Sequence, residues 1–307
     1  PEQVKNVKCI AVDGTTATLS WSDVSDDDIS YFVVECKQSD GVWKSVSRTS
    51  TNLGVNLSGL TPEHDYVYRV IGYDKRSNRG TPSEEITVTT LKDTICPKVT
   101  KITPDPGYFK SEINLRFTAE DDYRVKSIEI QTSTDKESWK TVSEIKATGE
   151  SAKCTFDCKL DLKNYEEGSV FVRAKVYDSY GNVTEDKDLT CYEYVVDRTA
   201  PIQPTGVTAS SGETEGGSSF VNISWNAITD DNSFAYYRVY KSNSADGEFT
   251  LLKNNVKTVN TYDENVDFSA TYYYKVEAVD LAGNVGKQSG VVSCKVKDDT
   301  EKPVIYD

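Results

Sequence analysis

Aspartates recur at matching places along this chain, and their carboxylates are the groups best suited here to bind a cation. Some lie in the linker before a repeated unit, some in the loop after an early strand, such as Asp121 and Asp122, and some at the end of a late strand. We expect these three places to meet at one end of each unit, at the junction with the unit before it. Calcium accepts about six to eight oxygen ligands from carboxylates and carbonyls in a flexible geometry. The candidate calcium ligands are Asp93, Asp121, Asp122, Asp178, Asp197, Asp230, Asp231 and Asp280.

The same aspartates also fit a purely structural role. Asp and Asn in loops form Asx-turns that brace the backbone, and Asp before Thr and Pro is common in linkers. Such a device needs no metal, so we expect that folding requires no cofactor and that calcium is a candidate only. In the first third of the chain, Asp26, Asp27, Asp28 and Asp74 have no linker before them, so a site there would be incomplete.

Two tryptophans suggest a different chemistry, stacking against sugar rings. Trp43 and Trp139 each follow a turn on a middle strand, where an exposed indole could bind a pyranose ring. Phe249 occupies the matching place in the last third of the chain, which favours packing across a sheet edge instead. Aromatic rings suit both roles because they combine a large apolar face with a defined contact geometry. Glycan binding and packing therefore both stay open.

The sequence contains no recognisable catalytic constellation. The only histidine, His64, precedes a strand and has no serine or cysteine partner that the sequence can identify. No spacing typical of zinc ligands occurs. Acidic pairs recur in every third of the chain, as a structural device does, instead of forming a single dyad. We therefore expect this chain to be non-enzymatic.

Charge and hydropathy exclude two classes of partner. Lysine and arginine total 35 against 49 acidic residues, which gives a net charge of −14. Such a surface repels phosphate backbones, so we expect no nucleic-acid binding. No segment approaches the roughly 20 apolar residues of a membrane span, so we expect no membrane insertion.

The elements that position these residues repeat three times, which predicts tandem units. An Asp followed four residues later by Asn, and an Asp followed four residues later by Pro, both step by 104 and then 102 residues. We therefore divide the chain into units at 1–92, 93–197 and 198–298, with 299–307 as a linker to a following domain. The first motif begins at Asp74, Asp178 and Asp280, and the second at Asp93, Asp197 and Asp299.

Within each unit, apolar residues alternate along short segments, which indicates strands with one buried face. No helical period is visible. At roughly 100 residues per unit, the pattern predicts an all-β fold of three tandem immunoglobulin-like β-sandwiches. The alternating sets are Ala17, Leu19 and Trp21; Tyr66, Tyr68 and Val70; Ile113, Leu115 and Phe117; Val170, Val172 and Ala174; Val221, Ile223 and Trp225; and Tyr272, Tyr274 and Val276.

The seven cysteines do not read as a disulfide framework. Cys154, Phe156 and Cys158 lie on one face of a predicted strand. The two cysteines are therefore about 13 Å from each other, which is beyond disulfide reach. An odd count also leaves at least one thiol unpaired. We expect free thiols that pack as small apolar side chains.

Three motifs in the third unit are specific: Asp-Arg-Thr-Ala-Pro at 197–201, Trp225 closing a core strand, and Ala-Val-Asp-Leu-Ala-Gly-Asn at 278–284. This unit resembles the fibronectin type III modules of bacterial extracellular proteins. The first unit resembles them through Trp21 and the segments Leu-Thr-Pro and Tyr-Val-Tyr-Arg-Val, although Ser77 replaces the glycine of its last loop. The middle unit has Phe117 and a valine where the others have Trp and Tyr, and is more similar to bacterial Ig-like domains.

This resemblance implies modules of a large bacterial protein, extracellular or at the cell surface. Free thiols there would suit a Gram-positive anaerobe. We predict non-catalytic, monomeric spacers that contact neighbouring domains of the same polypeptide and present a catalytic or adhesive domain, as in an accessory region of a glycoside hydrolase. The alternatives are an adhesion module that binds a glycan or host surface protein, and a module that packs on an enzyme and steers its substrate. The first and last residues, Pro1 and Asp307, suggest an internal piece of a longer chain.

Overall fold

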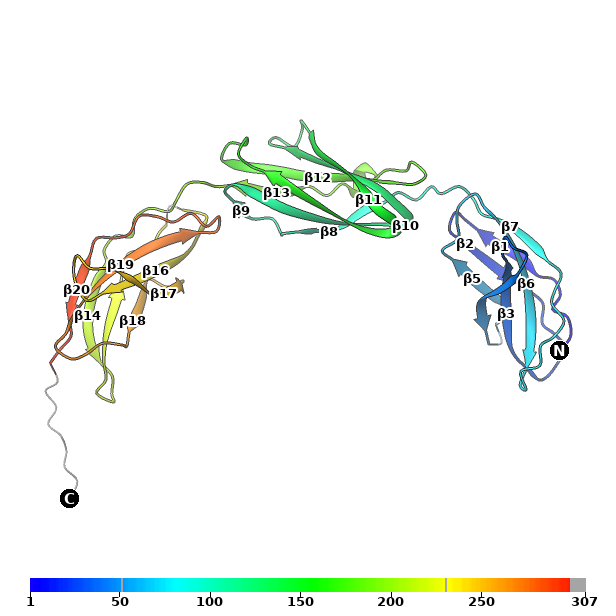
Figure 1. The fold of residues 1–307 in the computed structure, drawn as a ribbon, viewed down its shortest axis with the longest axis horizontal. Coiled ribbons are helices and arrows are strands. Elements are labelled where there is room, and N and C mark those ends of the chain that lie inside the picture. The colour runs from blue at the N-terminus through cyan, green and yellow to red at the C-terminus, as the bar shows by residue number, and fades with distance from the viewer. Residues whose placement is uncertain (51, 230, 299–307) are drawn as a thin grey trace, which may run out of the picture.

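The structure, a computed structural model, describes residues 1–50, 52–229 and 231–298. These residues form three groups of β-strands that follow one another as an open arch (Figure 1). Within the described ranges the only helix is the three-residue 3₁₀ turn η1, Asp186–Asp188. No helix in those ranges is long and apolar enough to cross a membrane. The predicted all-β fold of tandem sandwiches is confirmed, whereas the linker expected at 299–307 lies outside the described residues.

The first and third groups share one topology, a three-stranded sheet and a four-stranded sheet with all pairs antiparallel. In the first group the sheets are β1 (Lys8–Val12), β2 (Thr16–Ser20) and β5 (Gly54–Ser58), and β4 (Trp43–Thr49), β3 (Ile29–Lys37), β6 (Asp65–Asp74) and β7 (Ile86–Thr89). In the third group they are β14 (Thr208–Glu213), β15 (Ser219–Ser224) and β18 (Asn260–Asp263), and β17 (Thr250–Val256), β16 (Phe234–Ser242), β19 (Thr271–Asp280) and β20 (Val292–Lys295).

The middle group differs because two long strands run through both of its layers. β10 (Glu112–Ser133) pairs with β8 (Lys98–Thr103) near its start and with β12 (Gly168–Asp178) near its end. β11 (Lys140–Asp161) pairs with β10 on both sides of a break in register. The remaining strands are β9 (Tyr108–Phe109) and β13 (Tyr192–Val196).

One expectation about this group is wrong. We expected Asp121 and Asp122 in a loop, but the structure places them inside β10, where the register with β11 breaks between Glu120 and Val125. A break of this kind inserts unpaired residues and bends the strand, so β10 can pass from one layer to the other without ending. The bend re-aims the two carboxylates toward the end of the sandwich that faces the first group.

The predicted alternation matches the buried faces. The early-strand sets and the late-strand sets face three separate apolar cores, with Tyr66 the one member that is only half-buried. Trp21 meets Phe32 edge-on at 5.5 Å, and Trp225 meets Tyr237 at 5.1 Å. Such aromatic pairs add specific contact energy to the burial of apolar area.

The seven cysteines are free in the structure, as predicted. Cys158 is buried on the same face of β11 as Phe156. Cys154, two residues before Phe156, is half-buried. Burial raises the pKa of the Cys158 thiol, which favours the neutral form. Cys158 therefore packs as a small apolar side chain, as do the buried Cys36 and Cys294, whereas Cys191 is exposed.

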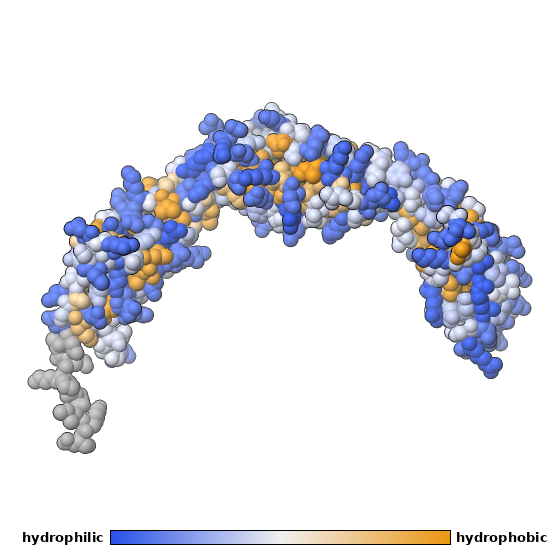
Figure 2. Space-filling model, viewed as in Figure 1, coloured by the Kyte–Doolittle hydropathy of each residue, from blue (hydrophilic) through white to orange (hydrophobic). Residues whose placement is uncertain are grey.

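Hydrophilic residues cover most of the molecular face shown in Figure 2, and hydrophobic residues form separate patches on it. A large continuous apolar patch would mark a docking surface, whereas scattered apolar residues are ordinary on soluble proteins. This face therefore carries no signature of an extensive hydrophobic partner interface.

Candidate functional site

The three aspartates that precede Asn by four residues each end a long strand and brace the hairpin that follows. Asp178 Oδ1 accepts hydrogen bonds from the amides of Tyr180 and Asn182, both at 2.8 Å, and its Oδ2 accepts one from Asn182 Nδ2 at 2.6 Å. Asp74 and Asp280 hold their own Asn in the same way. The hydrogen bonds lower the pKa of Asp74. The bracing role proposed from the sequence therefore accounts for this motif.

The Asn of the motif also holds the linker that enters its sandwich. Asn182 Nδ2 donates to the carbonyl of Asp93 at 3.2 Å, and Asn284 Nδ2 donates to the carbonyl of Asp197 at 3.0 Å. The repeated motif thus fixes the last hairpin and the incoming linker to each other, which explains why both motifs share one period.

At the start of the middle group, carboxylates from three segments converge. One oxygen each of Asp93, Asp121 and Asp178 lies within 4.8 Å of the others. Asp93 comes from the linker, Asp121 from the bend in β10, and Asp178 from the end of β12. Asp122 lies beside them and accepts a 2.8 Å hydrogen bond from the Thr15 hydroxyl of the first group. We call this region the first junction.

Burial and mutual repulsion both act on these groups. Asp93 is 1% exposed and Asp178 is 0% exposed. Burial, together with the charges of Asp122 and Asp178, raises the pKa of Asp93. Burial and the charges of the neighbouring carboxylates raise the pKa of Asp121 to about 6. Both shifts disfavour the ionised forms, as expected when like charges share a site with little water.

Neutralising groups are scarce at the first junction. The ion pairs found in the described ranges include none of its four aspartates. A surface hollow borders Asp121 and Asp122, and its rim carries Lys98 and Lys187. Lys187 is paired with Glu185 at 2.6 Å. The cluster therefore keeps unbalanced negative charge, with a solvent route to it through the hollow.

The equivalent residues of the third group define the second junction: Asp197, Asp231 and Asp280. Asp231 Oδ1 accepts hydrogen bonds from the amide and hydroxyl of Ser233, and Asp197 Oδ1 accepts one from the amide of Thr199. Among the described residues these three do not meet as a group of potential metal ligands. Asp230, the remaining candidate, lies outside the described residues.

The predicted aromatic residues are half-buried, and each ring is covered on one side by a cation from the strand two places away in the same sheet. The guanidinium of Arg69 lies 4.0 Å from the centre of the Trp43 ring, and that of Arg173 lies 4.0 Å from the Trp139 ring. Lys275 covers Phe249 at 4.2 Å. Cation–π packing of this kind uses a ring face that a sugar would need. This geometry favours the packing interpretation.

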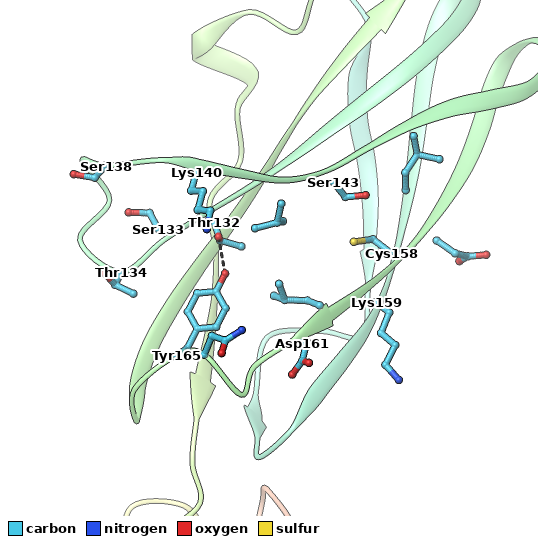
Figure 3. A pocket seen from close by; sticks show the side chains of 15 residues that line it. Thr132, Ser133, Thr134, Ser138, Lys140, Ser143, Cys158, Lys159, Asp161 and Tyr165 are labelled. Atoms are coloured by element: carbon cyan, nitrogen blue, oxygen red, sulfur yellow. Dashed lines mark hydrogen bonds between the residues drawn. The ribbon is translucent and has the colours of Figure 1, made fainter.

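Two places deserve comparison with a catalytic site. His64 packs edge-on against Tyr66 at 4.8 Å and has no triad around it. A pocket of the middle group, drawn in Figure 3, is lined by hydroxyls, apolar side chains and Tyr165, whose hydroxyl lies 2.8 Å from Thr132 Oγ1. Its Asp157 is paired with Arg116 at 2.6 Å, and Lys159 is paired with Glu112 at 2.7 Å, outside the pocket. Neither place offers a poised acid–base pair.

Sequence reasoning missed the side chains that cross the junctions. Tyr180 donates to the carbonyl of Pro62 at 3.1 Å, and Tyr123 approaches Thr61 Oγ1 at 3.4 Å. Arg198 follows Asp197 and donates to three backbone carbonyls of the middle group, at Lys110, Leu162 and Tyr165. A signal existed for the tyrosines, because Tyr123 follows Asp122 directly and Tyr180 lies two residues after Asp178, but none marked their partners.

Comparisons with known proteins point to one family. Residues 2–89 match the model of the fibronectin type III domain. The chain is 27% identical over 298 residues to exoglucanase B of Cellulomonas fimi, an alignment that covers 93% of this chain and 25% of that protein. It is 30% identical over 107 residues to chitinase Chi52 of Paenibacillus xylanexedens, covering 35% of this chain and 18% of that protein.

Among solved structures, the FN1–FN3 domains of chicken CNTN1 are 17% identical, with a TM-score of 0.49 and coverage of 97% of this chain and 99% of that chain. The chain spans a quarter or less of the length of the two bacterial relatives. The match to the first unit agrees with the resemblance seen in its sequence. Residues 2–89 thus belong to the fibronectin type III family, within a chain that is otherwise built of further β-sandwiches.

Proposed function

We propose that this chain is a non-catalytic spacer region of a larger, extracellular bacterial glycoside hydrolase, and that it holds the neighbouring domains of the same polypeptide apart. The observation that carries the proposal is the alignment to exoglucanase B, which runs through 93% of this chain but only 25% of that protein. The chain therefore resembles a repeated accessory portion of a longer enzyme. The match to a chitinase over a single-module length supports the same assignment.

The structure supports a spacer in two ways. The linkers are short and are bound at both ends, by the Asn side chains of the following hairpins and by contacts with the preceding sandwich. The described residues also offer no poised acid–base pair. A monomer of three sandwiches, each about 35 Å long from strands of roughly ten residues, spans about 100 Å. Free thiols in such a protein would suit an oxygen-poor habitat, as of a Gram-positive anaerobe.

The direct test replaces this segment in the parent enzyme with a flexible Gly/Ser linker. We expect unchanged turnover of a soluble oligosaccharide and slower hydrolysis of an insoluble polysaccharide, because only the insoluble substrate depends on how the domains are held. Loss of activity on both substrates to the same degree would contradict a spacer role.

A second measurement separates the spacer from an adhesion module. The 307-residue chain is tested alone on a glycan array and on insoluble polysaccharide. We expect no retention and no hydrolysis. Tight binding that is lost in Trp43→Ala or Trp139→Ala would overturn the proposal and favour glycan recognition. Size-exclusion chromatography with light scattering checks the expected monomer.

A further inference from the structure

We propose that Asp93, Asp121 and Asp178 form a calcium site that locks the first junction, with Asp122 at its edge. This goes beyond the spacer function, because a spacer needs no metal. It assigns the site to one junction of the two, although the sequence places similar aspartates at both.

Two buried carboxylate oxygens at the first junction have no hydrogen-bond partner among the described residues. Asp93 is 1% exposed; its Oδ1 accepts a hydrogen bond from the amide of Ile95 at 3.0 Å, while its buried Oδ2 has no hydrogen-bond partner. Asp121 Oδ1 is likewise buried without a partner. Buried polar oxygens are almost always hydrogen-bonded or bound to a cation. These orphan oxygens belong to two of the carboxylates that converge within 4.8 Å.

The negative charge of the cluster is also unbalanced. Three carboxylates at this separation repel one another, and the ion pairs within the described ranges leave all of them without a basic partner. Either carboxyl groups take up protons, or a cation neutralises them. A bound cation satisfies the orphan oxygens and the charge together, whereas a shared proton satisfies one pair of oxygens at most.

The ligand chemistry selects calcium. All three groups are carboxylates, which are hard oxygen ligands that suit calcium, magnesium and manganese rather than metals bound by thiolate or imidazole. Magnesium requires nearly octahedral geometry, while calcium tolerates irregular sets from separate segments. Asp93, Asp121 and Asp178 come from a linker, a strand bend and a strand end, which is an irregular set.

The position of the site gives it a mechanical consequence. Gly14 of the first group packs against the backbone of Asp93, where an added Cβ would lie 3.1 Å from its Cα. Thr15 donates to Asp122, and Tyr180 donates to Pro62. A cation that joins the linker to β10 and β12 therefore also fixes the surface on which the first sandwich rests.

The test uses the whole chain after treatment with a chelator, titrated with calcium by calorimetry at neutral pH. We expect a saturable site with a dissociation constant of about 0.1–1 mM, the range of extracellular calcium modules. At about 10 mM calcium, linkage then raises the melting temperature by about 5–20 °C. Magnesium at the same concentration should raise it less.

Two variants make the test specific. Asp121→Asn keeps the shape but removes one charge, so in chelator it should melt at a higher temperature than the native chain, while its calcium affinity falls at least about tenfold. Asp93→Asn should lower the calcium affinity to the same degree. Asp74→Asn is the matched control, because Asp74 braces a hairpin as Asp178 does and stands outside the cluster. Its calcium affinity should equal that of the native chain.

The outcomes are distinct. No heat of binding and no shift in melting temperature with calcium would overturn the site and leave the shared-proton explanation. Binding that survives unchanged in both Asp93→Asn and Asp121→Asn would place the cation elsewhere and also overturn the proposal. Since both variants preserve side-chain size, circular dichroism in chelator shows directly whether either has failed to fold.

Discussion

The two junctions of this chain hold their linkers with the same Asn hydrogen bond, but the side chains around the linkers carry opposite charges. At both, the Asn of a hairpin holds the carbonyl of the linker Asp. The first junction then gathers buried carboxylates around Asp93, whereas the linker at the second is tied down by the guanidinium of Arg198. The residue after Asp93 is the neutral Thr94. The repeated motif thus gives both junctions the same hydrogen bond to the linker, while the charged groups around the linker differ.

The junctions also differ in what crosses them. At the first, Thr15 meets Asp122, and the paired rings of Tyr123 and Tyr180 reach the neighbouring sandwich. At the second, Lys110 donates to the carbonyl of Gly283 at 3.0 Å from an exposed position. The three contacts at the first junction are partly buried, so solvent and salt weaken them less than they weaken the contact of an exposed lysine. The first junction should therefore be the stiffer one, most of all with a cation bound.

The largest expected effect tests what the junctions share. Asn182→Ala and Asn284→Ala each remove a hydrogen bond to a buried carboxylate and one to the linker carbonyl. Each should destabilise its own sandwich by about 2–3 kcal/mol, because buried acceptors are left without donors. Hydrogen exchange of the hairpin amides, measured in chelator, reports the two separately. Clearly unequal losses of protection in the two hairpins would show that the linkers are not held in the same way.

A smaller effect should belong to the second junction alone. Arg198→Ala removes the donors to the carbonyls of Lys110, Leu162 and Tyr165, and should cost about 1–2 kcal/mol. Thr94→Ala, at the aligned position of the first linker, is the control and should change stability by less than about 0.5 kcal/mol. Limited proteolysis of the linker detects the loosening. Equal cleavage of both variants would remove this difference between the junctions.

Removing one acidic charge should change the stability of the adjoining sandwich in opposite directions at the two junctions. In chelator, Asp121→Asn should stabilise the middle sandwich by about 1 kcal/mol, since burial and like charges raise the pKa of that carboxyl, with allowance for solvent screening. Asp231→Asn should instead destabilise the third sandwich by about 1 kcal/mol, because it weakens charge-assisted hydrogen bonds from Ser233. Thermal melting compares them, and two changes of the same sign would contradict the contrast.

The smallest effects concern the contacts that cross each junction. Thr15→Val removes the hydroxyl that donates to Asp122 and should cost about 0.5–1 kcal/mol. Lys110→Met removes an exposed lysine contact and should cost less than about 0.5 kcal/mol. Residual dipolar couplings measure how rigidly adjacent sandwiches are oriented. Greater loosening in Lys110→Met than in Thr15→Val would reverse the predicted order of stiffness.

Much of the fold was predictable because its signals are local. The alternation of residues such as Leu19, Leu115 and Ile223 identifies a buried strand face from spacing alone, since successive strand side chains point to opposite faces. The Asp–Asn motif likewise acts within a few residues. The bend in β10 was not predictable, because an acidic pair such as Asp121 and Asp122 reads as a loop unless the partner strands are known.

The sequence predicted the members of the candidate site and the end of each sandwich at which they lie, but not the distances between them. The sequence alone determined three repeated β-sandwich units, and it determined that an aspartate from each linker, early strand and late strand would face a junction. Only the tertiary structure decided that Asp93, Asp121 and Asp178 converge while their counterparts near Asp197 do not meet as a group among the described residues. The reason is that convergence depends on distances between segments far apart in sequence, and the bend in β10 that brings Asp121 to the other two is visible only in the pairing of the strands.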